Sequence, residues 1–393
     1  MADGAPHVAL NAQLLFGLAS YRSAGIHHYI DCLLRGLPQA GPELRFTVFA
    51  GAGQVVMPGA NVRRTALPTA RPWVRILWEQ LLQPLEVARL RPDLLHSLAF
   101  VSPFLSPCPT VVTVYDLSFK LTPDHFRPSQ RLYLSAFTAH SCRRARRVLA
   151  ISESTRSDLV RLFGLPRDKV DVAYPGVEAA FRPLPPAHVQ AFRDKRGLPD
   201  CFVLYLGTLE PRKNLATLIR AFAELRRARP GLALVLAGAR GWWYEDLFRQ
   251  VQDLGLAEFV LFPGFIPQAE LPLWYNAAAV FVYPSSYEGF GLPVAEALAC
   301  GRPVVTSASS SLPEAGGEAA LLVPPGDAPA LAAAVERALR LSPDELARGP
   351  AHAAYFTWTN TAATTVASYR RALRLGPAQP PGRSPAQPSA PRQ

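Results

Sequence analysis

Short apolar runs alternate with amphipathic segments along most of the chain. The apolar runs predict buried strands, and the segments between them, where apolar residues recur every three or four positions, predict helices. The predicted strands lie within residues 7–15, 46–51, 93–96, 110–119, 146–151, 169–177, 201–209, 232–238, 259–266, 280–286 and 301–305. Ser152 or Ser154 is expected to cap one of the helices. This alternation is typical of α/β proteins with parallel, doubly wound sheets.

Two such series are separated by a proline-rich, polar stretch, which we predict to be a linker at residues 183–199. A chain of 393 residues is too long for one ordinary core and suits two domains of similar size. We therefore predict two Rossmann-like domains, residues 1–182 and 200–352, facing each other across a cleft. A further helix is expected at 353–375, and the Pro/Gln/Ser-rich tail at 376–393 is expected to be disordered.

Composition indicates a folded chain without a membrane span. Hydrophobic residues make up 49% and charged residues 18%, and no apolar run approaches the ~20 residues that a spanning helix needs. The N-terminus carries Asp3 and no basic leader, so a secretion signal is not expected. The five cysteines are scattered without a CxxC pair, which favours reduced, buried thiols in a cytoplasmic protein over a zinc site or a disulfide framework.

The formal net charge of +11 is concentrated in the N-terminal half. Residues 1–183 carry +8 and residues 184–393 carry +3, so the first half suits anionic lipid or phosphate-bearing ligands. Nucleic-acid binding is not expected, because the basic residues are not interleaved with aromatics in a recognisable module.

Residues 71–92 form a basic amphipathic segment with helical spacing of its apolar positions. These positions are Trp73, Ile76, Leu77, Trp78, Leu81, Leu82 and Leu85. One interpretation is a helix buried in its domain. The other is a helix lying in the membrane interface, which would make the protein peripheral at the inner face of the cytoplasmic membrane.

The stretch YEGFGLPVAEALACGRPVV, residues 287–305, reads as a glycine-rich loop, a helix and the start of a strand. Gly289 and Gly291 let backbone N–H groups approach a ligand without a Cβ in the way. The loop therefore brings free amides and the positive end of a helix to one point, which suits a phosphate. Glu288 and Glu296 can accept hydrogen bonds from sugar hydroxyls.

A second loop, GTLEPRKNL at residues 207–215, also follows a strand and precedes a helix. Arg212 and Lys213 can hold a diphosphate there, the arginine as a fork and the lysine as a point charge. Gly238 and Gly264 repeat the glycine at a strand end, so these loops are expected to meet at one edge of the sheet.

In the N-terminal half, Gly25 lies in a loop that opens a helix, either as a second ligand-facing loop or as an ordinary strand-to-helix turn. Tyr115 and Asp116 lie at the end of a clear buried strand, and His96 ends the strand before it. These positions are candidates for the side of the cleft opposite the two loops.

The motifs GTLEPRKNLATLIRAFAEL, YEGFGLPVAEALACGRPVV and SSSLPEAGGEAALLVPPGD resemble the donor-binding half of family 4 glycosyltransferases, whose E-x7-E pattern falls on Glu288 and Glu296. The N-terminal half is also similar, in SAGIHHYI, in VYDLSF followed by PDHF, in RRARRVLAISESTRSDL and in VAYPGVEAAF. The resemblance covers roughly residues 5–375, with the motifs in the expected order.

The resemblance implies a two-domain GT-B fold that transfers a hexose, with mannose expected, from a GDP- or UDP-linked donor with retention of configuration. No metal and no other cofactor would be required. Lys213 and Arg212 would neutralise the departing diphosphate, Glu288 would meet the sugar, and Glu296 would bind the ribose. The implied donor-binding set is Gly207, Thr208, Arg212, Lys213, Gly238, Glu288, Gly289, Phe290, Gly291, Leu292 and Glu296. The segment from Phe356 to Trp358 would start a helix that crosses back to the first domain.

The acceptor would be a glycan or lipid-linked saccharide. Residues implied on its side are Gly25, His28, His96, Tyr115 and Asp116, with Asp116 also counted as catalytic beside Glu288, Lys213 and Arg212. Two positions depart from the family pattern. Thr208 stands where many members have Arg, a role that Arg212 would take, and Tyr115 stands where relatives commonly have His.

A tyrosine with its usual pKa of ~10 is no base near neutral pH. Retaining transfer can instead let the leaving phosphate take the acceptor proton, and His27, His28 and His96 are other candidates. Three alternatives stay open: a GT-B-fold epimerase or phosphorylase, a catalytically silent nucleotide-sugar-binding subunit and, least favoured, a dinucleotide oxidoreductase, since no GxGxxG follows a strand.

Overall fold

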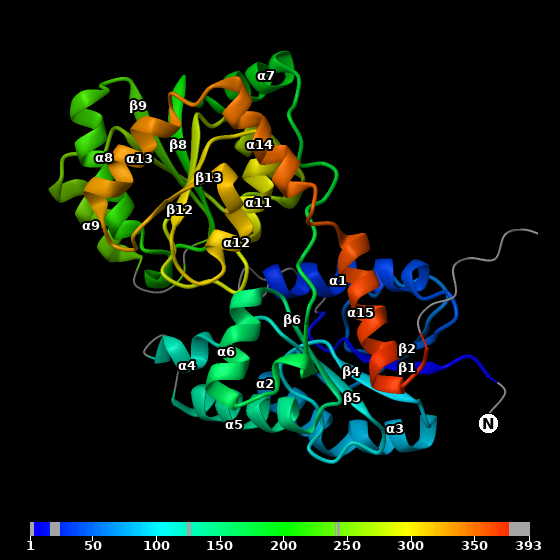
Figure 1. Cartoon of the computed structure of the whole chain (residues 1–393). Coiled ribbons are helices and arrows are strands. Elements are labelled where there is room, and N and C mark those ends of the chain that lie inside the picture. Colours follow the sequence, from blue (N-terminus) through cyan, green and yellow to red (C-terminus); the bar gives the residue numbers. More distant parts are fainter. Residues whose placement is uncertain are drawn as a thin grey trace, which may run out of the picture.

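The chain folds into two α/β domains, each built on one parallel sheet (Figure 1). The computed structural model describes residues 4–15, 24–123, 126, 128–239, 241 and 244–376. The predicted disordered tail therefore lies outside the described residues, apart from Gly376, and so does part of the PDHF motif.

The N-terminal sheet has seven strands in the order β3-β2-β1-β4-β5-β6-β7, all parallel. The order runs outward in both directions from β1, which is the arrangement of a doubly wound sheet with helices on both faces. Its strands are β1 His7–Asn11, β2 Arg45–Ala50, β3 Asn61–Arg64, β4 Leu94–Ser97, β5 Thr110–Val114, β6 Arg147–Ala150 and β7 Val170–Val172. Its helices are α1 Ala24–Ala40, α2 Pro72–Leu77, α3 Gln83–Leu90, α4 Ser118–Leu121, α5 Pro128–Arg144 and α6 Glu153–Phe163.

The C-terminal sheet has six parallel strands in the order β10-β9-β8-β11-β12-β13. Its strands are β8 Cys201–Leu206, β9 Leu232–Ala237, β10 Val260–Gly264, β11 Val280–Tyr283, β12 Val304–Ser307 and β13 Ala320–Val323. The helices are α8 Leu215–Ala228, α9 Glu245–Asp253, α10 Leu271–Ala277, α11 Leu292–Ala299, α12 Leu312–Gly316, α13 Ala328–Ala338 and α14 Pro343–Ala353. The predicted order of strand, glycine-rich loop, helix and strand is thus β11, loop, α11 and β12.

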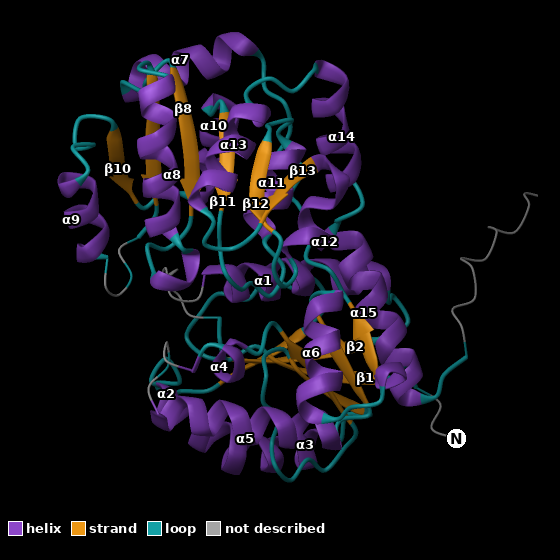
Figure 2. Ribbon diagram, turned by 60° about the vertical axis from the view of Figure 1, so that its left-hand side comes forward, coloured by secondary structure: helices purple, strands orange, loops and turns teal. Residues whose placement is uncertain are grey.

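Two helices follow the chain segments that join the domains. Helix α7, Pro186–Arg196, falls within the stretch predicted as a linker and packs Phe192 edge-on against Trp274 of α10. Helix α15, Trp358–Leu373, lies on the N-terminal domain beside α1, as Figure 1 shows. Seen from the side, α1 lies between the two sheets (Figure 2).

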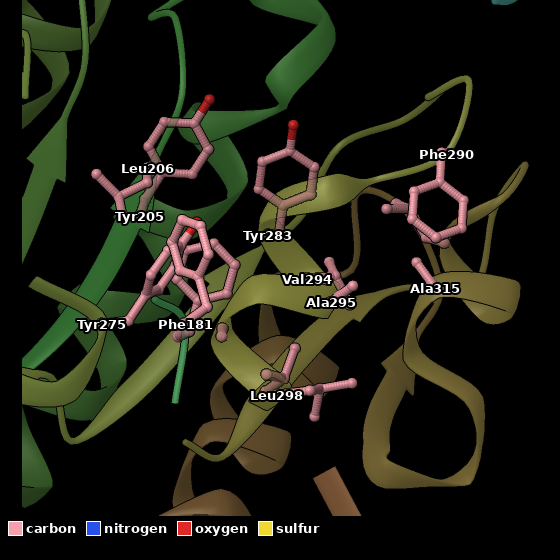
Figure 3. Packing of buried hydrophobic residues seen from close by; sticks show 14 of the residues in the cluster. Phe181, Tyr205, Leu206, Tyr275, Tyr283, Phe290, Val294, Ala295, Leu298 and Ala315 are labelled. Atoms are coloured by element: carbon pink, nitrogen blue, oxygen red, sulfur yellow. The ribbon is translucent and has the colours of Figure 1, made fainter. Parts of the chain in front are cut away.

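Aromatic side chains in the interior of the C-terminal domain lie at the carboxyl ends of the central strands, where the glycine-rich loops begin. Tyr205 of β8 and Tyr283 of β11 stack with ring centroids 5.8 Å apart. Figure 3 shows their hydroxyls pointing to the same side, away from the apolar side chains of α11. The hydroxyls of Tyr205 and Tyr283 therefore lie side by side at the ends of the two central strands, β8 and β11.

The basic amphipathic segment is helical from Pro72 to Leu90, with a π-helical turn over Trp78–Leu82 between α2 and α3. Val74, Trp78 and Val87 are buried, whereas Trp73 and Leu81 are each 61% exposed. One side of the segment therefore packs into the domain, as the first interpretation expects, while an apolar side faces solvent, and the membrane interpretation stays a prediction. Among the described helices, none combines the length and the hydrophobicity of a membrane-spanning segment.

All five cysteines are free thiols. Cys142 and Cys300 are buried, as expected, but Cys32, Cys108 and Cys201 are only half-buried, so the prediction of buried thiols is wrong for those three.

Candidate active site

Three charged side chains meet where β8 and β11 end. Lys213 lies in a short 3-10 turn, Pro211–Lys213, and its Nζ is 2.6 Å from Glu288 Oε1. Arg212 Nη1 lies 3.2 Å from the other carboxylate oxygen of Glu288. The loops carrying the predicted cations and the predicted sugar-binding carboxylate therefore form one cluster, across 75 residues of sequence.

The carboxylate of Glu288 is ionised in this cluster. Burial alone would raise its pKa, but the charges of Arg212 and Lys213 outweigh burial and lower the pKa to about 2. Burial lowers the pKa of Lys213, an effect that Glu288 opposes and Arg212 reinforces. Burying such ions is costly unless each is paired and hydrogen-bonded, which explains why the two loops are tied so closely together.

Four further residues hold Glu288 in place, and sequence reasoning did not single them out. Ser285 Oγ donates to Oε1 at 2.6 Å, and the hydroxyl of Tyr283 donates to the same oxygen at 3.2 Å. The backbone N–H of Glu288 donates to Ser310 Oγ, and Ser311 Oγ donates to the backbone carbonyl of Glu288. Ser285 lies in the PSS run just before one recognised motif, whereas Ser310 and Ser311 lie inside the motif SSSLPEAGGEAALLVPPGD, and these serine runs were the available signal.

Lys213 has one N–H bond that makes no hydrogen bond within the cluster. Lys213 Nζ donates to Glu288 and to the hydroxyl of Tyr283, which uses two of the three N–H bonds of an ammonium. Arg212 forks onto Glu210 as well as reaching Glu288 and the carbonyl of Tyr287. Two cations are thus balanced by Glu210 and Glu288, and the cations remain preorganised for a further anion.

Gly238 is needed for close packing of two loops. A Cβ there would lie 1.8 Å from the carbonyl oxygen of Gly207, so any larger residue would push the ends of β8 and β9 apart. Thr208 follows Gly207, and its carbonyl accepts a hydrogen bond from the hydroxyl of Tyr205. These residues shape the loop that carries Arg212 and Lys213.

Gly289 is one point of close contact between the two domains. A Cβ there would lie 2.2 Å from the carbonyl oxygen of Tyr115, so only glycine allows the loop before α11 to reach the N-terminal sheet. Thr155 Oγ1 lies within hydrogen-bonding distance of both the Tyr115 and the Gly289 carbonyls. Asp116, next in the chain, accepts from the backbone N–H and hydroxyl of Ser118 and acts electrostatically on Arg212. Asp116 therefore lies near the loops that carry Arg212 and Gly289.

A cavity lies beside this contact and is lined from both domains. Its lining residues are Leu121, Thr122, Ser154, Asp158, Arg161, Ser286, Tyr287 and Ser310. The hydroxyl of Tyr287 links the two domains. It donates to Asp158 Oδ2 at 3.0 Å and accepts from the backbone N–H of Leu117, and both of these residues belong to the N-terminal domain. The predicted cleft between the two domains is therefore present, with serines, an arginine and an aspartate on its walls.

Phe290 and Glu314 also join the domains. The Phe290 side chain packs against Tyr174 and Phe356, so only the backbone of this residue can face a ligand at the loop. The carboxylate of Glu314 accepts from the N–H groups of Glu153 and Ser154, which open α6 in the other domain. A negative charge at the start of a helix is favoured by the unpaired amides there.

Gly291 and Leu292 begin α11, and Glu296 lies one turn further on. The Glu296 carboxylate is buried and accepts a hydrogen bond of 2.8 Å from the hydroxyl of Tyr275. Burial raises its pKa to about 7, in contrast to Glu288. The two carboxylates of the E-x7-E pattern therefore have opposite electrostatic surroundings.

On the acceptor side, Tyr115 and His96 are interior residues. Tyr115 is buried and its hydroxyl donates to the carbonyl of Leu98, while burial raises its pKa well above 10. His96 has no exposed surface and contacts Tyr369 and Thr113, and burial lowers its pKa to about 3. Neither side chain is available as a proton acceptor at the cleft in this structure.

Gly25 and His28 lie on α1. Gly25 is exposed in the first turn, and His28 lies 3.3 Å from Glu178 and edge-on to Trp358. The structure therefore separates the predicted acceptor-side residues into Asp116 at the donor loops, two interior groups and two residues on one helix.

Comparisons with known proteins agree with this architecture. Residues 190–355 match Glycosyl transferases group 1, and residues 23–181 match Glycosyltransferase Family 4. The chain is 35% identical over 269 residues to O-antigen chain mannosyltransferase B of Escherichia coli, covering 66% of this chain and 70% of that protein. Seven other relatives are matched over 38% to 59% of their lengths.

Solved structures share the fold. Sucrose-phosphate synthase from Thermosynechococcus elongatus matches with a TM-score of 0.73 and 23% identity, over 93% of this chain and 98% of that one. The Anabaena protein Alr3699/HepE, crystallised with UDP, matches with a TM-score of 0.69 and 20% identity, over 93% and 99%. The two facing sheets are the GT-B fold predicted from the sequence. With its motifs, its fold and its relatives in agreement, the chain belongs to glycosyltransferase family 4.

Proposed function

We propose that this glycosyltransferase moves a hexose, with mannose as the expected sugar, from a nucleotide-sugar donor to a glycan or lipid-linked saccharide with retention of configuration. The observation that carries the proposal is the cluster of Arg212, Lys213 and Glu288 at the ends of β8 and β11. It supplies paired, preorganised cations beside the glycine loop that opens α11. The mannosyltransferase among the relatives supports the choice of sugar.

The reaction assigns each group one task. The bond between the sugar anomeric carbon and the diphosphate oxygen breaks, an acceptor hydroxyl oxygen bonds to that carbon on the same face, and the hydroxyl proton passes to the leaving phosphate. Lys213 and Arg212 stabilise the negative charge that develops on the diphosphate. Glu288 holds both cations and accepts from sugar hydroxyls, while Glu296 binds the ribose. Because the phosphate takes the proton, Tyr115 need not act as a base.

A transfer assay tests the proposal. The purified chain is incubated with GDP- and UDP-linked sugars and with mannoside acceptors, and the product is examined by NMR. The expected result is release of the nucleoside diphosphate, transfer with the donor's anomeric configuration, and equal rates with and without added Mg²⁺ or Mn²⁺. An inverted product overturns the mechanism. Conversion of the donor without an acceptor indicates an epimerase, and calorimetric donor binding without transfer indicates a silent subunit.

The exposed apolar side of α2, the π-helical turn and α3 supports a second element of the proposal, peripheral binding to an anionic membrane. Trp73, Leu77, Leu81 and Leu85 are each more than half exposed, and Arg71 lies at the start of the same helix. An amphipathic helix of this kind buries its apolar side at the lipid boundary while its basic residues meet anionic headgroups. The acceptor would then be reached at the cytosolic face.

Vesicle co-sedimentation tests the membrane contact. The chain is expected to sediment with vesicles containing anionic phosphatidylglycerol and less with neutral phosphatidylcholine. The double variant Trp73→Ser/Leu81→Ser should lose this binding. Leu132→Ser is the matched control, because Leu132 is 72% exposed on a different helix, α5. Equal sedimentation of all three proteins contradicts this element without affecting the transfer reaction.

A further inference from the structure

Three side chains with metal-binding atoms converge where α1 meets the segment that follows β7. His28 Nε2 lies 3.3 Å from Glu178 Oε1 and 3.7 Å from Cys32 Sγ. One ligand atom from each residue can be chosen so that all three lie within 4.8 Å of one another. Among the residues that the structure describes, this is the one group of three or more His, Cys, Asp or Glu side chains that meets this distance.

The spacing fits a tetrahedral zinc ion. Zinc bonds to Cys, His and carboxylate atoms are about 2.0–2.3 Å long, so neighbouring ligands of a tetrahedron lie about 3.3–3.7 Å apart. The two distances that involve His28 Nε2 fall in this range, and Cys32 Sγ lies equally close to Nδ1, at 3.8 Å, so the imidazole ring has to turn for Nε2 and the sulfur to bind one ion. His28 and Cys32 are four residues apart on α1, which places them on one face of the helix. The ligand set also matches the chemistry, since zinc accepts a thiolate, an imidazole and a carboxylate together.

We propose that His28, Cys32 and Glu178 bind one Zn²⁺ ion, with water in the fourth position. On binding, the Cys32 thiol gives up its proton to solvent and its sulfur bonds to the metal. All three residues are half-buried, so the ion can enter from solvent and still be held by protein on one side. The absence of a CxxC pair argued against a zinc site in the sequence, because two ligands come from one helix and the third is 146 residues beyond Cys32.

The site would tie together the parts that join the domains. Glu178 also accepts a hydrogen bond from Gln268, which precedes α10 in the C-terminal domain, and His28 packs edge-on against Trp358 at the start of α15. Next to Glu178, the N–H of Val177 donates to the carbonyl of Phe356. A metal ion here would fix α1 to both chain segments that pass between the domains. The site shares no residue with the Arg212, Lys213 and Glu288 cluster, and the inference does not rest on the proposed function.

Metal binding to the full chain, freed of any histidine tag and treated with a chelator that is then removed, tests the site. Calorimetry with Zn²⁺ is expected to show one ion per chain and a rise in the melting temperature. Co²⁺ provides a second readout, because a bound thiolate gives cobalt a sulfur-to-metal charge-transfer band. Both signals are measured without a nucleotide sugar, so their outcome is independent of transferase activity.

The variants identify the ligands. Cys32→Ser should abolish the cobalt band, and Cys32→Ser, His28→Ala and Glu178→Gln should each weaken zinc binding by about tenfold or more. Cys108→Ser is the matched control, since Cys108 is also a half-buried free thiol but lies outside the group. Circular dichroism shows whether each variant is folded, and the conservative Glu178→Gln keeps the side-chain volume. The proposal is overturned if the wild-type chain binds no zinc, or if the three variants bind it as the control does.

Discussion

The ends of the strands in the two domains carry different chemistry. In the C-terminal domain, the loops after β8 and β11 carry Lys213 and Glu288, whose buried side chains pair with each other. In the N-terminal domain, β4 and β5 end in His96 and Tyr115, whose polar atoms bond to neutral partners in the interior. Both domains use the same parallel, doubly wound topology, so the backbone alone does not account for the difference.

The difference indicates a division of labour. A nucleotide-sugar donor carries a diphosphate whose charge grows as the bond breaks, and paired cations in a partly buried site are suited to stabilise it. An acceptor hydroxyl brings no charge, and under the proposed function the facing domain presents Asp116 and a wall in which Asp158 and Arg161 lie beside neutral residues. Under the proposed function, the N-terminal domain contributes contacts to the acceptor and the C-terminal domain contributes electrostatic stabilisation.

Removing the charges should have the largest effect. Lys213→Ala and Glu288→Ala are each expected to lower kcat by about 10²–10³, the usual cost of losing one preorganised charge stabiliser. Initial rates with a nucleotide sugar provide the measurement. Lys195→Ala, an exposed lysine on α7, should leave the rate unchanged. Rates for Lys213→Ala and Glu288→Ala within about threefold of wild type would remove the cluster from the mechanism.

A double variant separates catalysis from folding. Glu288→Gln leaves the buried Lys213 without its carboxylate, which costs about 3–5 kcal/mol of unfolding free energy, whereas Lys213→Met leaves Glu288 paired with Arg212. Lys213→Met/Glu288→Gln removes both charges, so it should be more stable than the sum of the two single effects predicts. Additive losses in denaturant unfolding would show that the two groups are not energetically coupled.

The two carboxylates of the E-x7-E pattern should show opposite pH dependence. The pKa of Glu288 is lowered to about 2, so its stabilisation is present above the usual pKa near 4.5 and is lost as the pH falls from there toward 2. The pKa of Glu296 is raised to about 7, so the folded state keeps a proton that the unfolded state loses, and stability falls as the pH rises from about 4.5 to 7.

Unfolding measured across pH checks this contrast. Glu296→Gln should remove the loss of stability between pH about 4.5 and 7, and Glu288→Gln should remove the loss below pH about 4.5. If each variant instead changed the pH window assigned to the other, the assignment of the shifts would be reversed.

The smallest effect is expected at Tyr115. Tyr115→Phe removes the hydrogen bond to the carbonyl of Leu98 and should cost about 1–3 kcal/mol of unfolding free energy, because that buried carbonyl loses its partner. The rate of transfer should change by less than about threefold, since the phenol does not move the acceptor proton. A loss of kcat approaching that of Lys213→Ala would show that this hydroxyl takes part in the reaction.

Several elements could be predicted from local pattern alone, and others could not. Apolar runs predicted the strands of both sheets apart from β3, Asn61–Arg64, and β13, Ala320–Val323, which each lie at a sheet edge and are partly exposed. Ser152 caps α6 as expected, since its hydroxyl accepts from the N–H of Thr155. Helix α14 was missed because Gly349 and Pro350 lie inside it, although Ser342 and Glu345 form a capping box at its start.

The candidate site divides in the same way. The sequence alone determined which loops would carry cations, glycines and carboxylates, because glycine at a strand end and charge before a helix are local requirements of phosphate binding. It also determined the family, through motifs that keep their order along the chain. Only the tertiary structure decided that Arg212 and Lys213 are paired with Glu288, and that Tyr115 and His96 are closed off from the cleft. Pairing and burial depend on residues that are far apart in sequence. The free energies of these ion pairs and of burial therefore arise only when folding brings the residues together.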